Sequence, residues 1–476
     1  MWQSELRNFF EPRGVAVFGS VRNLSGTAYG VVKNMLDFGF SGKIYPVNPS
    51  ASSGEVLGLH VYSDVSEISG DIDLAVIIIP PRTVPDVVSQ CAQRGIRAAI
   101  VVSEGFAEVG EEGKDLQARL VEISRRTGIR ILGPNTLGVL NTSNYLVTTP
   151  YLIGYNKPLK GTISYCSQSG LLTFGTHPLR DRAYPVSKVC DFGNKCDVNE
   201  VDLLEYLVND SGTAAIVMHL EDIKDGQKFL GSARKAVGRK PVLIFKPTKS
   251  EVSAKAAASH TGALAGNDQV YDTAFRQAGV IRVNSWQEFW EIPRVFATQP
   301  LPRGNRVAII TATGGAGVIL VEEAIRVGLV ITEFTTETKR KLAVLSPRLA
   351  QNPVDVGPLM AVSIGSDPIA VYERSIPIVL EDRNVDCAVV VCPGNLAIVD
   401  VFRRIADCIS QLLKPVTVFC YGVNLADIQE TVRQLQNLGF PAYLELEMAV
   451  KALGVAAIYS RIKGRAPIAD TYSSQD

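Results

Sequence analysis

One histidine of this sequence lies in a segment made almost entirely of very small residues. The segment KAAASHTGALAG contains His260, one of only four histidines in 476 residues. Small side chains offer little surface to a packed core, and glycine loosens the backbone. A segment of this kind suits movement or close approach to another group. An imidazole accepts a phosphoryl group when one ring nitrogen is unprotonated and an acceptor holds the other N–H.

Two further features provide what a phosphoryl group on His260 would need. Glu221, in HLEDIKDG, supplies a carboxylate that could accept the imidazole N–H. The run CSQSG predicts a strand-to-helix turn whose backbone amides and serine hydroxyls could bind a dianionic phosphate at a positive helix end. Its candidate phosphate-binding residues are Ser167, Gln168, Ser169 and Gly170. The plainer alternatives are an acid favoured at a helix start for Glu221 and an ordinary N-cap for SQSG.

A second candidate site follows the first apolar strand. The strand RGVAVFGS runs into the loop SVRNLSGTAYG and then into a helix. Loop amides and a positive helix end in this order suit the pyrophosphate of a dinucleotide-like ligand. The glycines are Gly19, Gly26 and Gly30, so the GxGxxG spacing is absent and NAD is disfavoured.

Other strand ends of the same block carry polar residues, proline and glycine. They include VNP, IPP, SEGF and GPNTLGVLN. In open α/β sheets, ligands bind in a crevice at the carboxyl edge, where such strand ends meet. The alternative is that proline and glycine simply mark the ends of strands. The candidate residues of this site are Gly19, Ser20, Val47, Asn48, Pro49, Ile79, Pro80, Ser103, Glu104 and Asn135.

Short apolar runs alternate with amphipathic helical patterns along the whole chain, which indicates parallel α/β folding. A prior of roughly 100–200 residues per domain suggests about three domains. Two polar or proline-containing stretches, TSNYLVTTPYLIGYNKPLKG and ATQPLPRGN, divide the series. We therefore predict a Rossmann-like domain followed by two flavodoxin-like domains, at residues 1–142, 157–296 and 303–463.

The composition excludes several classes of protein. Lys plus Arg and Asp plus Glu are equal at 48 each, so bulk charge argues against a nucleic-acid or membrane-surface role. The start lacks the features of a signal peptide, and no run reaches about 18 apolar residues, which predicts a soluble cytoplasmic protein. The eight cysteines include no CxxC pair and are expected to be reduced and buried. A metal site at Cys190, Cys196 and His219 lacks the close pairing that zinc favours, so none is predicted.

Several of these runs together resemble a known family. GKIYPVNP, DLAVIIIPP, VVSEGFAEVGEEGKDLQ and GIRILGPNTLGVLN resemble the CoA-binding domain of the NDP-forming acyl-CoA synthetases, the relatives of succinyl-CoA synthetase. YCSQSG, DFGNKCDVNEVDLLEYL, LEDIKDGQKFL and SHTGALAG are similar to the rest of that family's alpha subunit, in the same order. The resemblance covers essentially the whole chain and is most specific around His260.

The resemblance implies a function and a partner. The first domain would bind CoA, His260 would match the phosphorylated histidine, Glu221 its partner carboxylate, and the SQSG turn the phosphate-binding helix start. The chain would be the alpha subunit of an ADP-forming acetyl-CoA or acyl-CoA synthetase. TGGAG lacks the end of a P-loop, and no ATP-grasp pattern is present. ADP or ATP with Mg²⁺ is therefore expected on an ATP-grasp beta subunit of a hetero-oligomer, while CoA, a carboxylic acid and phosphate are expected on this chain.

Two other functions compete with this one. A CoA-binding or acyl-CoA-binding regulatory protein would keep the fold without turnover, but it has no need of a phosphoryl acceptor. An NAD-linked dehydrogenase would require the fingerprint that the first loop lacks. Neither the acyl group nor the physiological direction of the reaction follows from the sequence.

Overall fold

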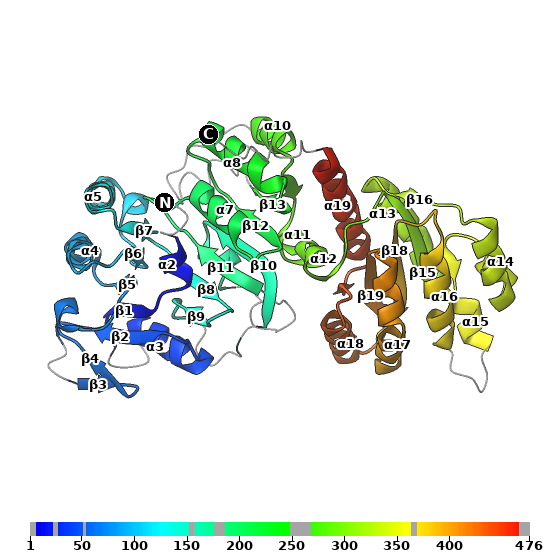
Figure 1. The fold of residues 1–476 in the computed structure, drawn as a ribbon, viewed down its shortest axis with the longest axis horizontal. Coiled ribbons are helices and arrows are strands. Elements are labelled where there is room, and N and C mark those ends of the chain that lie inside the picture. Colours follow the sequence, from blue (N-terminus) through cyan, green and yellow to red (C-terminus); the bar gives the residue numbers. More distant parts are fainter. Residues whose placement is uncertain are drawn as a thin grey trace, which may run out of the picture. The chain divides into compact units, whose positions relative to one another are not determined.

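A computed structural model describes residues 6–21, 27–50, 54–151, 157, 159–175, 186–247, 268–362 and 369–465. The chain forms two compact units, Met1–Phe289 and Trp290–Asp476. The first unit contains one parallel sheet and one mainly parallel sheet, and the second unit contains one parallel sheet (Figure 1). The prediction of an α/β fold built from parallel sheets is thus confirmed. The division into three domains stays a prediction.

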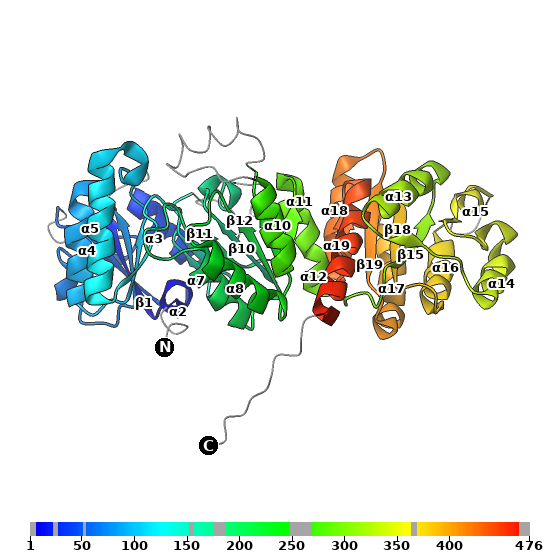
Figure 2. The ribbon, with the colours of Figure 1, turned by 90° about the horizontal axis from the view of Figure 1, so that it is seen from above.

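The first sheet of the first unit has five parallel strands in the order β2-β1-β5-β6-β7. Every residue of β1 is buried, as expected for the continuous apolar run of a central parallel strand. The helices α4 and α5 pack side by side against this sheet (Figures 1 and 2). The strands are β1 (Gly14–Gly19), β2 (Lys43–Val47), β5 (Leu74–Ile78), β6 (Ala98–Val101) and β7 (Arg130–Leu132), with a hairpin of β3 (Gly54–Val56) and β4 (Leu59–Val61). The helices are α2 (Arg7–Phe10), α3 (Thr27–Phe38), α4 (Val84–Gln93) and α5 (Glu111–Thr127).

The second sheet has seven strands in the order β14-β13-β12-β10-β11-β8-β9. Its first five strands are parallel, while β8 pairs antiparallel with β11 and β9 antiparallel with β8. The segment that follows the first sheet therefore joins the second sheet. The strands are β8 (Val139–Asn141), β9 (Leu146–Val147), β10 (Lys160–Ser167), β11 (Val186–Asp191), β12 (Ala215–His219), β13 (Val242–Phe245) and β14 (Ile281–Val283). The helices are α7 (Glu200–Asn209), α8 (Gly226–Val237), α10 (Asp268–Ala278) and α11 (Trp286–Glu291), which crosses into the second unit.

The second unit is built around a parallel sheet in the order β16-β15-β18-β19-β20, with β17 also paired to β15. The helices α13 and α19 pack together, as do α16 and α17 (Figure 1). The strands are β15 (Arg306–Thr311), β16 (Val330–Ile331), β17 (Val354–Asp355), β18 (Cys387–Pro393), β19 (Val416–Tyr421) and β20 (Ala442–Tyr443). The helices are α12 (Val295–Thr298), α13 (Gly314–Arg326), α14 (Thr336–Leu345), α15 (Gly357–Val362), α16 (Ala370–Glu381), α17 (Leu396–Leu412), α18 (Leu425–Asn437) and α19 (Leu446–Arg465).

The parallel strands of the three sheets follow a similar winding order. In both sheets of the first unit the first parallel strand lies between the second and the third; in the sheet of the second unit β15 lies between β16 and β18, while β17 pairs with β15 outside the main order. The direction of winding therefore reverses beside the first strand, where the chain leaves a crevice at the carboxyl edge. Short 3₁₀ helices occupy several of the connections, at Val65–Glu67, Pro81–Thr83, Ala107–Val109, Gly170–Leu172, Ile292–Arg294 and Pro347–Leu349.

The cysteines were expected to be reduced and buried, and the expectation of burial is wrong for Cys408. All eight cysteines are free; Cys196 is partly buried, Cys408 is exposed, and the others are buried. In the part of the chain that the structure describes, no group of three or more His, Cys, Asp or Glu side chains is placed to hold a metal ion. None of the described helices is both long enough and apolar enough to cross a membrane.

Candidate functional site

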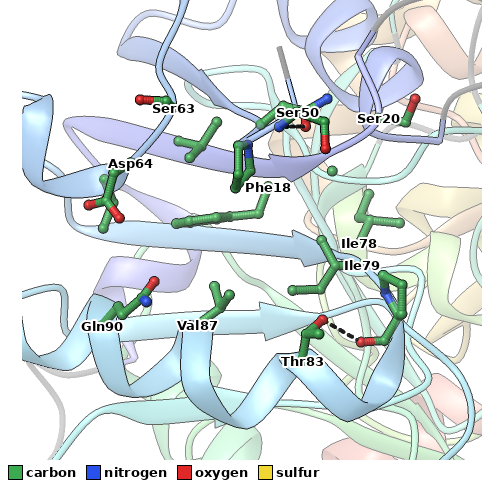
Figure 3. A pocket seen from close by; sticks show the side chains of 16 residues that line it. Phe18, Ser20, Ser50, Ser63, Asp64, Ile78, Ile79, Thr83, Val87 and Gln90 are labelled. Carbon is green, nitrogen blue, oxygen red and sulfur yellow. Dashed lines mark hydrogen bonds between the residues drawn. The ribbon is translucent and has the colours of Figure 1, made fainter. Parts of the chain in front are cut away.

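A cavity of about 550 Å³ lies at the reversal point of the first sheet. It opens where β1, β2 and β5 end, and α4 forms one of its walls (Figure 3). Most of the residues predicted to bind the nucleotide-like ligand line it, because parallel strands bring their carboxyl ends to one edge. They are Gly19, Ser20, Val47, Asn48, Pro49, Ile79 and Pro80.

The lining of this first cavity is mixed. Apolar surface comes from Phe18, Ile79 and Val87, and polar groups come from Ser63 and Asp64 (Figure 3). The pKa of the Asp64 carboxyl is lowered by its hydrogen bonds with Ser66, whose backbone N–H donates to Oδ1 at 2.8 Å. An apolar cavity with a few placed polar groups is the usual form of a small-molecule site.

A second cavity of about 590 Å³ adjoins the first and lies between the two sheets of the first unit. Ile78, Ile79 and Pro80 line both cavities. The second cavity brings together predicted residues from the two candidate sites, which are far apart in sequence. They are Ser103, Glu104 and Asn135 from the first sheet, and Gln168, Ser169 and Gly170 from the second.

Hydrogen bonds fix the strand ends that separate the two cavities. The Ser103 hydroxyl donates to the carbonyl of Ile79 at 2.6 Å and accepts from its N–H at 3.1 Å. The backbone N–H of Asn135 donates to the Ser103 carbonyl at 3.0 Å. Asn135 itself has φ +58°, in the left-handed region that asparagine tolerates better than most residues. Proline and polar residues after strands were the sequence pattern that predicted this site. In the structure these residues form backbone turns that hydrogen bonds connect to one another.

Ser167 was predicted to bind phosphate, but its hydroxyl is hydrogen-bonded within the SQSG turn. The Ser169 N–H donates to the Ser167 hydroxyl at 2.9 Å, and that hydroxyl donates to the Ser169 carbonyl at 2.8 Å. His219 Nδ1 lies 3.0 Å from the same hydroxyl, and burial, with Lys246 nearby, lowers the pKa of His219 to about 3. Ser167 is buried within the turn and does not line the cavity. Its hydroxyl shapes the turn, while Gln168, Ser169 and Gly170 reach the cavity surface.

Glu221 lies directly after β12, on the same sheet edge as this turn. Its backbone N–H donates to Gln168 Oε1 at 2.6 Å, and its carbonyl accepts from Lys246 Nζ at 3.0 Å. The Glu221 side chain is neither fully buried nor fully exposed.

His260 lies outside the described residues, within 248–267. Lys246 and Asp268, which lie before and after this range, are both hydrogen-bonded to Arg282. Arg282 donates from Nη2 to Asp268 Oδ1 at 2.5 Å and to the carbonyl of Lys246 at 3.1 Å. β13, which precedes this range in the sequence, ends beside β12 at the same sheet edge as Glu221.

Asp191, at the end of β11, is a cavity residue that the sequence analysis missed. Its Oδ2 accepts from the Leu137 N–H at 2.6 Å, and its Oδ1 accepts from the Gly193 N–H at 3.3 Å. Thr136 donates a hydrogen bond from its hydroxyl to the Asp191 carbonyl. These bonds join the turn after the first sheet to the second sheet. Burial, together with the negative charge of Glu221, raises the pKa of Asp191 to about 7 against the lowering effect of its hydrogen bonds.

Replacing Asp191 with asparagine is expected to change how stability depends on pH. When the pKa of a carboxyl is higher in the folded state than in the unfolded state, its contribution to stability is complete at any pH below the unfolded-state pKa of about 4. That contribution declines as the pH rises and is lost above about 7. The free energy of unfolding of Asp191→Asn, measured in urea, should therefore rise relative to that of the parent chain as the pH increases from 5 to 8. A constant difference across this range would show that Asp191 has an ordinary pKa.

The second unit repeats the hydroxyl-based turn at the end of its first strand. Thr311 and Thr313 exchange the same pair of hydrogen bonds as Ser167 and Ser169. The side chain of Asn352 accepts from the Ile309 N–H at 3.0 Å and donates to the Val307 carbonyl at 2.9 Å, so it holds the sheet together. Asp355 Oδ1 accepts from the Gly357 N–H at 3.0 Å.

Two family models match the first unit and the residues just beyond it. The CoA binding domain model matches residues 13–142, and the succinyl-CoA ligase like flavodoxin domain model matches residues 160–296. The first match includes all ten residues predicted to bind the nucleotide-like ligand. The second includes the SQSG turn, Glu221 and His260.

Whole-chain comparisons extend the likeness. The chain is 36% identical to the acetate–CoA ligase [ADP-forming] I subunit alpha of Pyrococcus furiosus, over 97% of this chain and 99% of that protein. It is 35% identical to the acetate–CoA ligase [ADP-forming] II of Archaeoglobus fulgidus, covering 96% of this chain and 67% of that protein. A solved acetyl-coenzyme A synthetase 1 of Ca. Korarchaeum cryptofilum, in complex with phosphate and ADP, has a TM-score of 0.86 at 31% identity over 96% of this chain and 97% of that one.

Proposed function

Because this chain belongs to the family of ADP-forming acetate–CoA ligases, we propose that it is the alpha subunit of an ADP-forming acyl-CoA synthetase. As an acid–thiol ligase, it reversibly converts acyl-CoA, ADP and phosphate to a carboxylic acid, CoA and ATP. The single observation that supports this proposal most is the second cavity, where the predicted CoA residues and the SQSG turn share one space. A thioester arriving from the first cavity would meet phosphate there.

The proposed reaction has three reversible steps. A phosphate oxygen attacks the thioester carbonyl, the C–S bond breaks, and the thiol leaves with a proton, which gives an acyl phosphate and CoA. An unprotonated nitrogen of His260 then attacks phosphorus, the P–O bond of the mixed anhydride breaks, and the carboxylate leaves. Finally the phosphoryl group passes from His260 to a terminal oxygen of ADP. Splitting the transfer in this way replaces one difficult step by easier ones.

The predicted residues that line the two cavities, together with Glu221 and His260, provide the groups of this scheme. The first cavity, with Gly19, Ser20 and the Val47–Pro49 turn, holds CoA. Ser103, Glu104 and Asn135 hold the thiol end, near Ile79 and Pro80. Phosphate binds at Ser169 and Gly170, which line the second cavity; the turn leads into a three-residue 3₁₀ helix instead of the predicted helix start. Glu221 accepts the imidazole N–H of His260, which keeps the attacking nitrogen unprotonated.

The nucleotide site is proposed to lie on a partner. The sequence contains no P-loop and no ATP-grasp pattern, and the similar Pyrococcus furiosus protein is named a subunit alpha. We therefore propose a hetero-oligomer with an ATP-grasp beta subunit that binds ADP or ATP with Mg²⁺. We propose that the assembly works in the cytoplasm. The near-zero formal charge offers no general attraction to nucleic acid or to a membrane surface.

Titration of the chain with CoA and with NAD tests the ligand assignment. CoA is expected to bind and NAD is not. Val87→Trp places a large ring in the first cavity and should weaken CoA binding at least about tenfold, or about 1.4 kcal/mol. Gln93→Trp, on the exposed end of the same helix, is the matched control and should bind CoA like the parent chain. Equal affinity of both variants for CoA would place the ligand elsewhere, and tight binding of NAD alone would remove the proposal.

A further inference from the structure

The side chain of Gln168 makes contacts that a phosphate ligand would not need. Its Oε1 accepts from two consecutive backbone N–H groups, Glu221 at 2.6 Å and Asp222 at 3.2 Å. Its Nε2 donates to Asp222 Oδ1 at 2.8 Å. The carboxamide therefore bridges from the end of β10 to the turn after β12. Only one orientation of the amide matches these donors and acceptors, because the carboxylate accepts and the backbone N–H groups donate.

A buried lysine holds the Asp222 side of this bridge. Lys195 Nζ lies 2.7 Å from Asp222 Oδ1 and 3.0 Å from Glu200 Oε2, and it donates to the Asp222 carbonyl at 3.0 Å. The Lys195 and Glu200 side chains are only 1% and 2% exposed. Burial alone would raise the pKa of Asp222, but Lys195 and the hydrogen bond from Gln168 outweigh it and lower the pKa. Asp222 is thus held as a carboxylate that accepts from Gln168.

The bridge acts on Glu221 through its backbone. Gln168 holds the Glu221 N–H on one side, and Lys246 Nζ donates to the Glu221 carbonyl on the other at 3.0 Å. The peptide groups on both sides of the Glu221 Cα are therefore fixed to the second sheet. A carboxylate on a fixed backbone loses less freedom when it binds a partner.

We propose that Gln168 is a positioning residue for Glu221, and that Asp222 and Lys195 lock its carboxamide in the required orientation. This inference rests on the proposed function, because it gives Glu221 its role there. It also replaces the predicted role of Gln168 in phosphate binding, because its side chain holds the Glu221 turn and its backbone N–H donates to the His219 carbonyl at 3.3 Å. The chain of contacts runs from Lys195 through Asp222 and Gln168 to Glu221.

Exchanging the donor and the acceptor tests this arrangement. Gln168→Glu sets a second carboxylate against Asp222, 2.8 Å from it in the present geometry. The double variant Gln168→Glu/Asp222→Asn puts an amide donor opposite the introduced carboxylate and restores the net charge. In the double variant the amide group takes the place of the Asp222 Oδ1 that Lys195 also contacts at 2.7 Å. Lys195 then keeps only Glu200 and the carbonyl of residue 222. Two residues in one hydrogen-bond network typically have a coupling free energy that corresponds to a change of roughly 2- to 100-fold in a rate constant.

Two readouts on the full chain distinguish the outcomes. In the assembly with its nucleotide-binding subunit, Gln168→Glu should lower kcat roughly 10- to 100-fold with little change in the KM for CoA. The double variant should recover part of the loss, since it restores the contact between residues 168 and 222 but not the contact of Lys195 with Asp222 Oδ1. In the chain alone, amide exchange of Glu221 and Asp222 should accelerate in the single variant and slow again in the double variant. Full activity of Gln168→Glu, or equal damage in both variants, would overturn the inference.

The amide-exchange readout separates this inference from the proposed function. If the parent assembly showed no ligase activity, the proposed function would fail, while exchange would still report whether Gln168 fixes the Glu221 backbone. If the parent assembly were active and the swap neither restored kcat nor slowed exchange, the inference alone would fail. Urea unfolding of each variant at the assay temperature shows whether the fold is retained.

Discussion

Replacing His260 with alanine is expected to abolish turnover of the assembled ligase while leaving its affinity for CoA within about twofold. The imidazole is the only group in the scheme that carries the phosphoryl group between acyl phosphate and ADP, so no slower route through the same intermediates remains. Removal of an essential nucleophile lowers kcat by orders of magnitude, and at least about 1000-fold is expected here. Steady-state ATP formation from acyl-CoA measures the loss, and isothermal titration measures CoA binding.

The matched control for this substitution is His60→Ala. His60 lies in the β3–β4 hairpin, where it packs edge-on against Tyr62 and lines neither of the two cavities. This variant should keep turnover close to the parent value. Retained acyl-CoA synthesis in His260→Ala would contradict the proposed phosphohistidine intermediate.

Replacing Glu221 with glutamine is expected to have the second largest effect. The substitution keeps the size of the side chain and the backbone contact with Gln168, but it removes the negative charge that would hold the imidazole N–H. Proton-transfer and orienting groups of this kind contribute roughly 10²- to 10⁴-fold to a rate. We expect a fall of that order in the rate of His260 phosphorylation, measured by rapid quench, with acyl phosphate formation much less affected.

Glu205→Gln serves as the control for Glu221→Gln. Glu205 lies on the exposed surface of α7, where it accepts a hydrogen bond from the Ser232 hydroxyl. Its substitution should leave both steps unchanged. If Glu221→Gln phosphorylated His260 at the parent rate, Glu221 would be an ordinary acid at the start of a connection, the alternative that its sequence position also allows.

The carboxyl-edge residues were the part of the site that sequence patterns predicted best. Apolar runs such as GVAVFG and LAVII set the strands, and parallel strands bring their ends to one edge. Gly19, Asn48 and Pro80 therefore meet at one cavity although they are far apart in the sequence. The location followed from the period of hydrophobicity and from the strand ends alone.

Contacts between the two sheets of the first unit could not be predicted in this way. Asp191 is an acidic residue in an apolar strand, and only its burial against the Leu137 turn shows that it faces a cavity. Lys195 reads as a surface lysine in GNKCD, yet it is buried with Glu200 and Asp222. Such pairings depend on which strands become neighbours, and a local pattern does not contain that information.

The SQSG turn is a second case in which the sequence pattern did not predict where a side chain points. Hydroxyls near a helix start predict phosphate donors or caps equally well. Ser167 instead points inward, where it shapes the turn and meets a neutral His219. The same pair of hydrogen bonds occurs at Thr311 and Thr313, where the hydroxyl also shapes the end of a strand.

The assembled enzyme should carry a phosphoryl group on one histidine during turnover, and labelled ATP tests this most directly. The chain is incubated with its nucleotide-binding subunit and labelled ATP, and the phosphopeptides are mapped. An acid-labile, base-stable label on His260, lost when ADP or a carboxylic acid with CoA is added, is the predicted result. An assembled complex that binds CoA but acquires no label on His260 would contradict it and would favour a CoA-binding protein without turnover.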